Sequence, residues 1–334
     1  MAQVGADGRL EQSIGDPDIE VTLRSAVKPF ALTALVESGA ADDLRLSPAE
    51  LAVMAASHTG EDMHVRTLQA VFRRAGVSQS LLTCGTEGMP LDPVTAARLA
   101  RDGEMPGAIR HMCSGFHAAS ILLSRYSDWS LEDYDRADHP SQVASKLAVA
   151  RAFGQRPATL RMAIDDCGLA TFAFPLVEIA RAFALLADPS GVAADPARTA
   201  MAPALLRIRD AMMASPEMIG GNGDVLDTRL MRTKSRRLVA KGGAEGLRGV
   251  GLLPGARGPD SETAGLAVRI EDGDGFARAA RSVTVEALYQ LGVLSEDESR
   301  ALASHHRPTV HSAAGSVVAQ TVPGFVLAPI SELV

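Results

Sequence analysis

The order of strand-like and helix-like segments is the feature that most constrains the fold of this chain. Residues 1–24 read as strand, turn and strand, with turn signals at Asp7-Gly8 and Gly15-Asp16-Pro17. Residues 237–241 and 265–271 read as strands near the other end, and the periodic segments between them predict helices. The simplest fold joins the strands of both ends in one sheet. We therefore predict an α/β (α+β) protein with an antiparallel sheet from both chain ends and a mainly helical lobe.

The same pattern predicts how the 334 residues are divided. We expect a sheet-containing lobe over 1–24 and 229–334 and a helical lobe over 25–228, forming one structural unit with the active site between the lobes. A final strand or an extended tail is expected over 317–326. Helices are expected at 25–39, 47–56, 62–75, 92–102, 113–126, 141–153, 174–187, 196–214 and 276–291.

Composition excludes several classes of partner. The formal net charge is −7, no basic run occurs, and aromatic residues are only 4 %, so nucleic acid is not expected as a partner. No apolar stretch reaches the length of a membrane span, and no signal peptide is evident at the start. Three cysteines are too few and too far apart for a disulfide scaffold. We expect a cytoplasmic protein that contacts neither nucleic acid nor membrane.

Ser25-Ala26-Val27-Lys28 is the first candidate for chemistry. Residues three apart share a helix face, so the Lys28 amine can reach the Ser25 hydroxyl and accept its proton when the amine is neutral. Of 33 lysines and arginines only four are lysine, so a lysine is retained where an amine must lose its proton, which arginine cannot do. The alternative is a helix face with a solvated lysine.

Lys241-Gly242-Gly243 ends a predicted strand and is the second candidate. Glycines beside the lysine let a substrate approach the strand edge closely. Ser-x-x-Lys followed by Lys-[Ser/Thr]-Gly on a strand is a signature of class A β-lactamases and penicillin-binding proteins, and Lys-Gly-Gly stands in the last position here. Lys241 would favour the neutral amine of Lys28 by like-charge repulsion and bind a substrate carboxylate. The alternative is a solvated lysine at a strand end.

Three further groups leave their roles open. Cys113-Ser114-Gly115-Phe116-His117 opens a helix, and its Ser114 suits the hydroxyl of the middle sequence element of such a site. Cys113 and His117 are four apart and suit a metal, or Cys113 packs in the core. Asp165 lies in a tight turn and binds an amine or caps the turn, and His58 is catalytic or belongs to a capping turn. His305-His306 is given no role.

Read together, these segments resemble the bacterial asparaginase II family of the rhizobial type. The resemblance implies a β-lactamase/penicillin-binding-protein-like serine hydrolase fold and hydrolysis of L-asparagine to L-aspartate and ammonia. The matching stretches follow the family's order between about residues 5 and 290, and they are 24–30, 35–41, 56–61, 113–118, 139–142, 165–168 and 241–246.

The resemblance also implies roles for single residues. It implies two catalytic Ser–Lys pairs, Ser25 with Lys28 and Ser57 with Lys241, and we expect a homodimer that acts on a small amide. The residues expected to contact the substrate are Arg24, His58, Ser114, His117, Asp165, Gly242 and Gly243.

One departure concerns a metal. The family's site uses two cysteines, which match Cys113 and Cys167, and a lysine, whose place is taken by Phe116. Phenylalanine has no donor atom and adds apolar bulk, so we expect that no cofactor is required. Zinc is the metal that the two cysteines could still bind. The alternatives are a serine amidase or acyltransferase in a specialised pathway, acting on a bulkier or less polar amide, and a non-catalytic ligand-binding relative. The presence of Ser25, Lys28, Ser57 and Lys241 speaks against the last.

Overall fold

The computed structural model describes residues 1–192, 195–274 and 278–328 of the chain. The chain divides into two compact units, the first from 1–26, 174–192 and 229–334 and the second from 27–173 and 193–228. The first unit therefore includes a stretch, 174–192, that the sequence assigned to the helical lobe. Among the described helices, none combines the length and the apolar character needed to cross a membrane.

The first unit is built on a five-stranded antiparallel sheet. Strand β1 pairs with β8, with Ala2 opposite Ala267, so strands from both parts of the chain share one sheet as predicted. The strand at residues 20–22 does not belong to this sheet, contrary to the prediction. The specific β-lactamase fold stays a prediction. In sheet order the strands are β2 (Leu10–Ser13), β1 (Ala2–Gly5), β8 (Ala264–Val268), β7 (Arg248–Leu252) and β6 (Leu238–Gly242).

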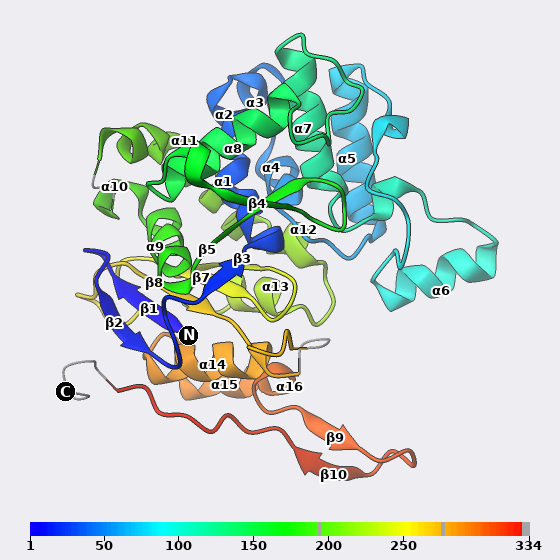
Figure 1. The fold of residues 1–334 in the computed structure, drawn as a ribbon. Coiled ribbons are helices and arrows are strands. Elements are labelled where there is room, and N and C mark those ends of the chain that lie inside the picture. Colours follow the sequence, from blue (N-terminus) through cyan, green and yellow to red (C-terminus); the bar gives the residue numbers. More distant parts are fainter. Residues whose placement is uncertain (193–194, 275–277, 329–334) are drawn as a thin grey trace. The chain divides into compact units, whose positions relative to one another are not determined.

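Glycines on one face of this sheet let a helix approach it closely. A Cβ added at Gly265 would lie 1.9 Å from the Ala180 carbonyl oxygen of α9 (Leu176–Ala187), and one added at Gly249 would lie 2.0 Å from the Phe183 ring. Glycine is depleted in strands in general, which is why the sequence did not predict β7. Helix α14 (Ala280–Gln290) contacts β8, and Figure 1 shows it on the side of the sheet away from α9.

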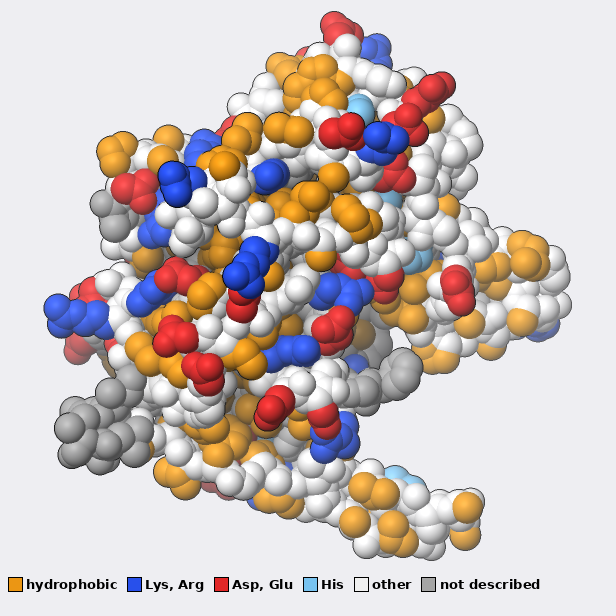
Figure 2. Space-filling model, in the orientation of Figure 1, with side chains coloured by type: hydrophobic (Ala, Val, Ile, Leu, Met, Phe, Trp, Pro, Cys, Tyr) orange, Lys and Arg blue, Asp and Glu red, His pale blue; other side chains and the backbone are white. Residues whose placement is uncertain are grey.

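The C-terminal part of the first unit ends in a hairpin of β9 and β10. Every residue of both strands is exposed, and Figure 2 shows hydrophobic side chains along the hairpin. The predicted final strand is therefore shorter than 317–326 and ends at Gln320. The remaining elements of this unit are β3 (Glu20–Thr22), α10 (Pro189–Val192), α15 (Glu296–Ala301), α16 (Ala303–His306), β9 (Thr309–His311) and β10 (Val317–Gln320).

The second unit is mainly helical, as predicted. Its one described hairpin, of β4 (Arg161–Ile164) and β5 (Ala170–Pro175), was not predicted from the sequence. Its helices are α1 (Lys28–Ala31), α2 (Thr33–Glu37), α3 (Ala40–Asp43), α4 (Pro48–Met54), α5 (Asp62–Ala75), η2 (Gln79–Leu81), α6 (Pro93–Asp102), η3 (Ala108–Arg110), α7 (Ser114–Tyr126), α8 (Pro140–Ala152), η4 (Pro157–Thr159), α11 (Pro196–Ala214) and α12 (Pro216–Gly220). The boundaries between the units fall within η1 (Arg24–Val27), within β5, after Val192 and within α13 (Leu226–Met231).

The first predicted helix is the one that differs most. The sequence predicts one helix over 25–39, whereas the chain forms the 3-10 helix η1 and then the short helices α1 and α2. Pro29 explains the start of α1, because proline has no N–H and favours the first turn of an α-helix. By contrast, the Ser47–Glu50 capping box and the bounds of α5 and α11 agree with the sequence.

Candidate active site

Lys28 lies at the centre of a buried polar cluster in the second unit. Its side chain is 2 % exposed, and its Nζ donates to the Ala56 carbonyl oxygen at 2.6 Å and to Ser57 Oγ at 3.4 Å. The same Nζ lies 3.2 Å from Cys113 Sγ. A buried amine is costly unless it is hydrogen-bonded, and these contacts satisfy it. The fold thus brings together three residues singled out in the sequence: Lys28, Ser57 and Cys113.

Backbone hydrogen bonds hold Ser57 in place after α4. Its N–H donates to the Ile219 carbonyl oxygen at 3.1 Å, and the next N–H, of His58, donates to the Met112 carbonyl oxygen at 3.3 Å. Gly60 follows with a φ of 78°, and a Cβ there would lie 2.5 Å from the Arg110 carbonyl oxygen. Only glycine fits this close approach, so the backbone presents the Ser57 hydroxyl from a fixed position.

His58 and Ser114 form a hydrogen-bonded chain. The Gly60 N–H donates to His58 Nδ1 at 3.1 Å, so the ring proton lies on Nε2, which contacts Ser114 Oγ at 3.0 Å. Ser114 Oγ in turn donates to the Ile109 carbonyl oxygen at 2.8 Å. Burial lowers the pKa of His58 well below its ordinary value and keeps the ring neutral. These contacts fasten the 57–61 segment to the start of α7, and a substrate role for either residue stays a prediction.

The turn of the β4–β5 hairpin brings Cys167 to Cys113. A hydrogen bond from Cys167, the nearby charge of Lys28 and contact with His111 hold the pKa of Cys113 well below its ordinary value, despite burial. The same hydrogen bond and burial raise the pKa of Cys167. Of the two sulfurs, that of Cys113 therefore has the lower pKa. The β4–β5 hairpin carries this contact, which explains why no residue spacing in the sequence signals it.

The residues around this pair do not fit a zinc site. Zinc takes four ligands in structural sites and three protein ligands in catalytic ones. Phe116 is buried and has no donor atom, and across the described ranges no three His, Cys, Asp or Glu residues are grouped so that they could hold a metal ion. Lys28 Nζ instead contacts Cys113 directly. We therefore assign no step of the chemistry to a metal.

His117 contacts Tyr134, a residue that was not singled out from the sequence. His117 Nδ1 lies 2.7 Å from the Tyr134 hydroxyl, which also accepts from the Thr83 N–H at 3.1 Å. Burial lowers the pKa of His117 to about 4, so its ring is neutral near pH 7. Tyr134 is one of only three tyrosines, which was the one available signal for it.

Asp165 begins the predicted turn between β4 and β5. Its N–H donates to the Leu169 carbonyl oxygen at 2.9 Å, and its Oδ1 accepts the Asp166 N–H at 2.9 Å. Gly168 closes the turn with a φ of 96°. These contacts account for a turn at this place, and binding of a substrate amine by Asp165 stays a prediction.

The first unit brings Ser25 to the end of strand β6. A Cβ added at Gly243 would lie 2.5 Å from the carbonyl oxygen of Leu23, two residues before Ser25. Arg24 adopts a φ of 49°, which is uncommon for a residue with a side chain, and its Nη1 pairs with Glu245 Oε1 at 2.6 Å. The Arg24–Ser25 segment therefore lies against the glycines that follow Lys241.

Lys241 lies within the same sheet and is fully buried. It faces Gly249 across the β6–β7 pair, and its Nζ donates to the Gly242 carbonyl oxygen at 2.6 Å. Ser25 and Lys241 belong to the first unit, whereas Lys28 and Ser57 belong to the second. The pairings of Ser25 with Lys28 and of Ser57 with Lys241 stay predictions.

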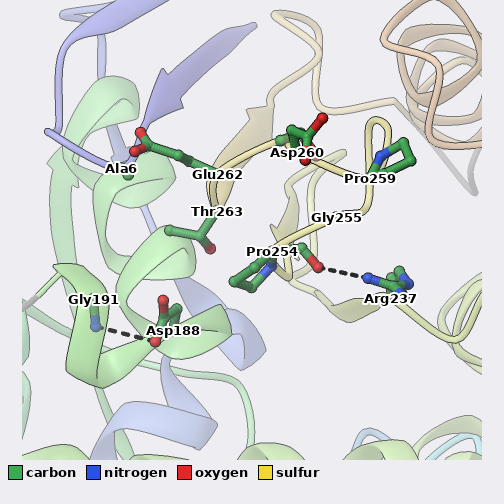
Figure 3. A pocket seen from close by; sticks show the side chains of 11 residues that line it. Ala6, Asp188, Gly191, Arg237, Pro254, Gly255, Pro259, Asp260, Glu262 and Thr263 are labelled. Carbon is green, nitrogen blue, oxygen red and sulfur yellow. Dashed lines mark hydrogen bonds between the residues drawn. The ribbon is translucent and has the colours of Figure 1, made fainter.

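A separate cavity of about 410 Å³ lies in the first unit (Figure 3). Two of its charged side chains are already hydrogen-bonded: Arg237 donates to the Pro254 carbonyl oxygen at 2.9 Å, and Asp188 accepts the Gly191 N–H at 3.0 Å. The cavity contains none of the residues predicted to carry chemistry. It is lined by Ala6, Asp188, Gly191, Arg237, Pro254, Gly255, Pro259, Asp260, Ser261, Glu262 and Thr263.

Comparison with known proteins agrees with the motifs. The family model described as L-asparaginase II matches residues 1–323, nearly the whole chain. No curated protein matches the chain.

Proposed function

Because this chain belongs to the L-asparaginase II family, a family of hydrolases of linear amides, we propose that it hydrolyses L-asparagine to L-aspartate and ammonia. The observation that carries the proposal is the buried amine of Lys28, which lies three residues after Ser25 and contacts Ser57 Oγ, because a buried amine close to hydroxyl groups can serve as the base that activates a serine. We also propose the β-lactamase-like fold, a cytoplasmic location and a homodimer.

In the proposed acylation step, Ser25 Oγ attacks the side-chain carboxamide carbon of asparagine. The hydroxyl proton passes to Lys28 Nζ, and the tetrahedral intermediate collapses as Lys28 returns a proton to the departing ammonia. The Ser25 N–H and an N–H after Lys241 stabilise the oxyanion. The uncommon backbone conformation of Arg24 and the contact of Leu23 with Gly243 support this placement, since they fix the two residues that precede the serine.

In the deacylation step, a water molecule attacks the acyl-serine and Lys28 accepts its proton. Lys28 then returns this proton to Ser25 Oγ as the acyl–oxygen bond breaks, and L-aspartate departs. The contact between Lys28 Nζ and Ser57 Oγ supports a relay role for Ser57, because a hydroxyl both accepts and donates. Lys241 binds the substrate carboxylate and Asp165 its α-amino group. We propose that these steps proceed without a metal, since the donor set around Cys113 and Cys167 lacks a third ligand.

Trapping of the acyl-enzyme tests the choice of nucleophile. We expect ammonia release from L-asparagine to fall on the order of 10⁴-fold or more in Ser25→Ala, with no acyl adduct in rapid-quench mass spectrometry. Ser57→Ala is the matched control and should still acylate, although slowly. An adduct that forms in Ser25→Ala and disappears in Ser57→Ala would contradict the assignment and make Ser57 the nucleophile.

A second candidate function is hydrolysis of a bulkier or less polar amide. It rests on Phe116, a buried apolar side chain three residues after Cys113 at the start of α7. We expect Phe116→Lys to raise the activity on L-asparagine relative to less polar amides, and Phe116→Leu, which stays apolar, to leave that ratio unchanged. Thermal melting of both variants shows whether they are folded. An unchanged ratio in a folded Phe116→Lys would exclude Phe116 as a determinant of the substrate.

A further inference from the structure

Three helices of the first unit bring a carboxylate, an imidazole and a hydroxyl together in a hydrogen-bonded series. His306 Nε2 lies 2.5 Å from Glu286 Oε2, and His306 Nδ1 lies 2.9 Å from Ser299 Oγ. All three side chains are buried, and they come from α14, α15 and α16, which lie together in Figure 1. None of them takes part in the chemistry proposed above.

This order of groups is the one that activates a serine. A nucleophilic hydroxyl needs a base within hydrogen-bond reach, and the base needs a third group that orients it. His306 has both partners, one on each ring nitrogen. In well-known serine triads the carboxylate bonds Nδ1 and the serine Nε2. The two nitrogens exchange places here, and either nitrogen of a neutral imidazole can accept the proton.

Neighbouring hydrogen bonds hold Glu286 and His306 in place. Gln290 Nε2 donates to Glu286 Oε1 at 2.7 Å, and Ser282 Oγ donates to the His306 carbonyl oxygen at 2.5 Å. Burial alone would raise the pKa of Glu286, but hydrogen bonds from Gln290 and His306 and the charge of Arg307 lower it overall. Glu286 is therefore a carboxylate near pH 7, and its hydrogen bond orients the His306 ring.

Ser299 and His306 both line a cavity of about 270 Å³, which places this end of the cluster beside a space for a bound molecule. Its volume is below that of most ligand sites, which suits a small substrate. Arg300 pairs with Glu296 and Asp297, whereas Arg307 is half-exposed and 3.9 Å from Glu286. The lining residues are Tyr289, Glu296, Ser299, Arg300, Ala303, His306, Arg307 and Gln320.

We propose that Ser299, His306 and Glu286 form a second hydrolytic centre, which cleaves esters of short carboxylic acids. Ser299 Oγ attacks the ester carbonyl carbon while its proton passes to His306 Nδ1. The alkoxide leaves with that proton, and an acyl-serine forms. Water then attacks the acyl-serine, its proton passes through His306 to Ser299 Oγ, and the carboxylic acid departs. Arg307 supplies positive charge for the oxyanion.

A serine-directed fluorophosphonate tests the proposal on the full chain. The Ser25→Ala background removes reaction at the family serine, and peptide mass spectrometry locates the adduct. We expect an adduct on Ser299 and none on Ser295, which caps the same helix and bonds Glu298 instead of an imidazole. Hydrolysis of 4-nitrophenyl acetate should disappear in Ser299→Ala, while ammonia release from L-asparagine by the otherwise native chain stays unchanged in that variant.

The rate of adduct formation on Ser299 tests the roles of His306 and Glu286. We expect His306→Gln to slow adduct formation on Ser299 about 10²-fold or more, which is the lower end for loss of a general base. Glu286→Gln keeps the shape and should slow it less. Folded chain with no adduct on Ser299, or equal labelling of Ser299 and Ser295, would overturn the proposal and leave the cluster a structural one. These outcomes do not depend on whether the chain is an asparaginase.

Discussion

The cluster around Lys28 in the second unit and the cluster around His306 in the first share one arrangement. Each places a buried nitrogen base beside a serine hydroxyl, at 3.4 Å for Lys28 with Ser57 and at 2.9 Å for His306 with Ser299. They differ in how the charge of the base is balanced. Lys28 contacts a backbone carbonyl and the Cys113 sulfur, whereas His306 contacts the Glu286 carboxylate.

That difference has a functional meaning. A carboxylate orients an imidazole and stabilises the imidazolium that forms when the imidazole accepts a proton. Glu286 is placed to do both for His306. A lysine acts as a base only while its amine is neutral, so the Lys28 cluster depends on a dry environment and on where the neighbouring positive charges lie. We expect the two clusters to respond differently to loss of one member.

The largest difference is expected when Lys28 is replaced by arginine. Lys28→Arg keeps the positive charge but cannot give up its proton, so amide hydrolysis should fall about 10²- to 10⁴-fold. Steady-state ammonia release measures the loss, and Lys146→Arg is the matched control because Lys146 has no assigned role. An active, folded Lys28→Arg would mean that Lys28 is not the base.

Loss of one member of the His306 cluster should instead lower stability. Glu286→Ala leaves a buried imidazole without its carboxylate, and breaking a buried pair in this way costs ~3–5 kcal/mol of unfolding free energy. The double change Glu286→Leu and His306→Leu should cost less, because no polar group is left unpaired. Chemical denaturation measures both values. A Glu286→Ala protein as stable as the native chain would show that the pair is not tightly coupled.

A smaller effect on stability is expected from His117, the neutral histidine of the second unit. The pKa of His117 is about 4 in the folded chain against an ordinary value of 6.5, so the unfolded chain binds more protons between these values. Stability therefore falls by up to ~3 kcal/mol as the pH drops from 6.5 to about 4.

The pH dependence of unfolding in His117→Gln isolates this contribution, because glutamine keeps a hydrogen bond and does not titrate. We expect a shallower loss of stability in the variant than in the native chain. Identical slopes in the two proteins would mean that His117 titrates alike in the folded and unfolded states.

Local patterns explain which elements were predicted well. Helices α5 and α11 carry clear periodicity and end signals, and their bounds agree with the prediction. Strand β7 and the β4–β5 hairpin were missed, because Gly249 and Gly251 are unusual in strands and the hairpin residues 161–164 are exposed. The prediction of one continuous helix over 25–39 was wrong, since Pro29 favours the first turn of a new helix, α1.

The sequence by itself determined the motifs, their order and the antiparallel sheet, because short-range spacing and alternation are properties of the chain. Only the tertiary structure decided that Cys113 meets Lys28 and Cys167, and that His306 stands between Glu286 and Ser299. Such contacts join residues that are separated by 7 to 85 positions. No local pattern encodes them, because packing of the helices and hairpins alone sets which buried polar groups become partners.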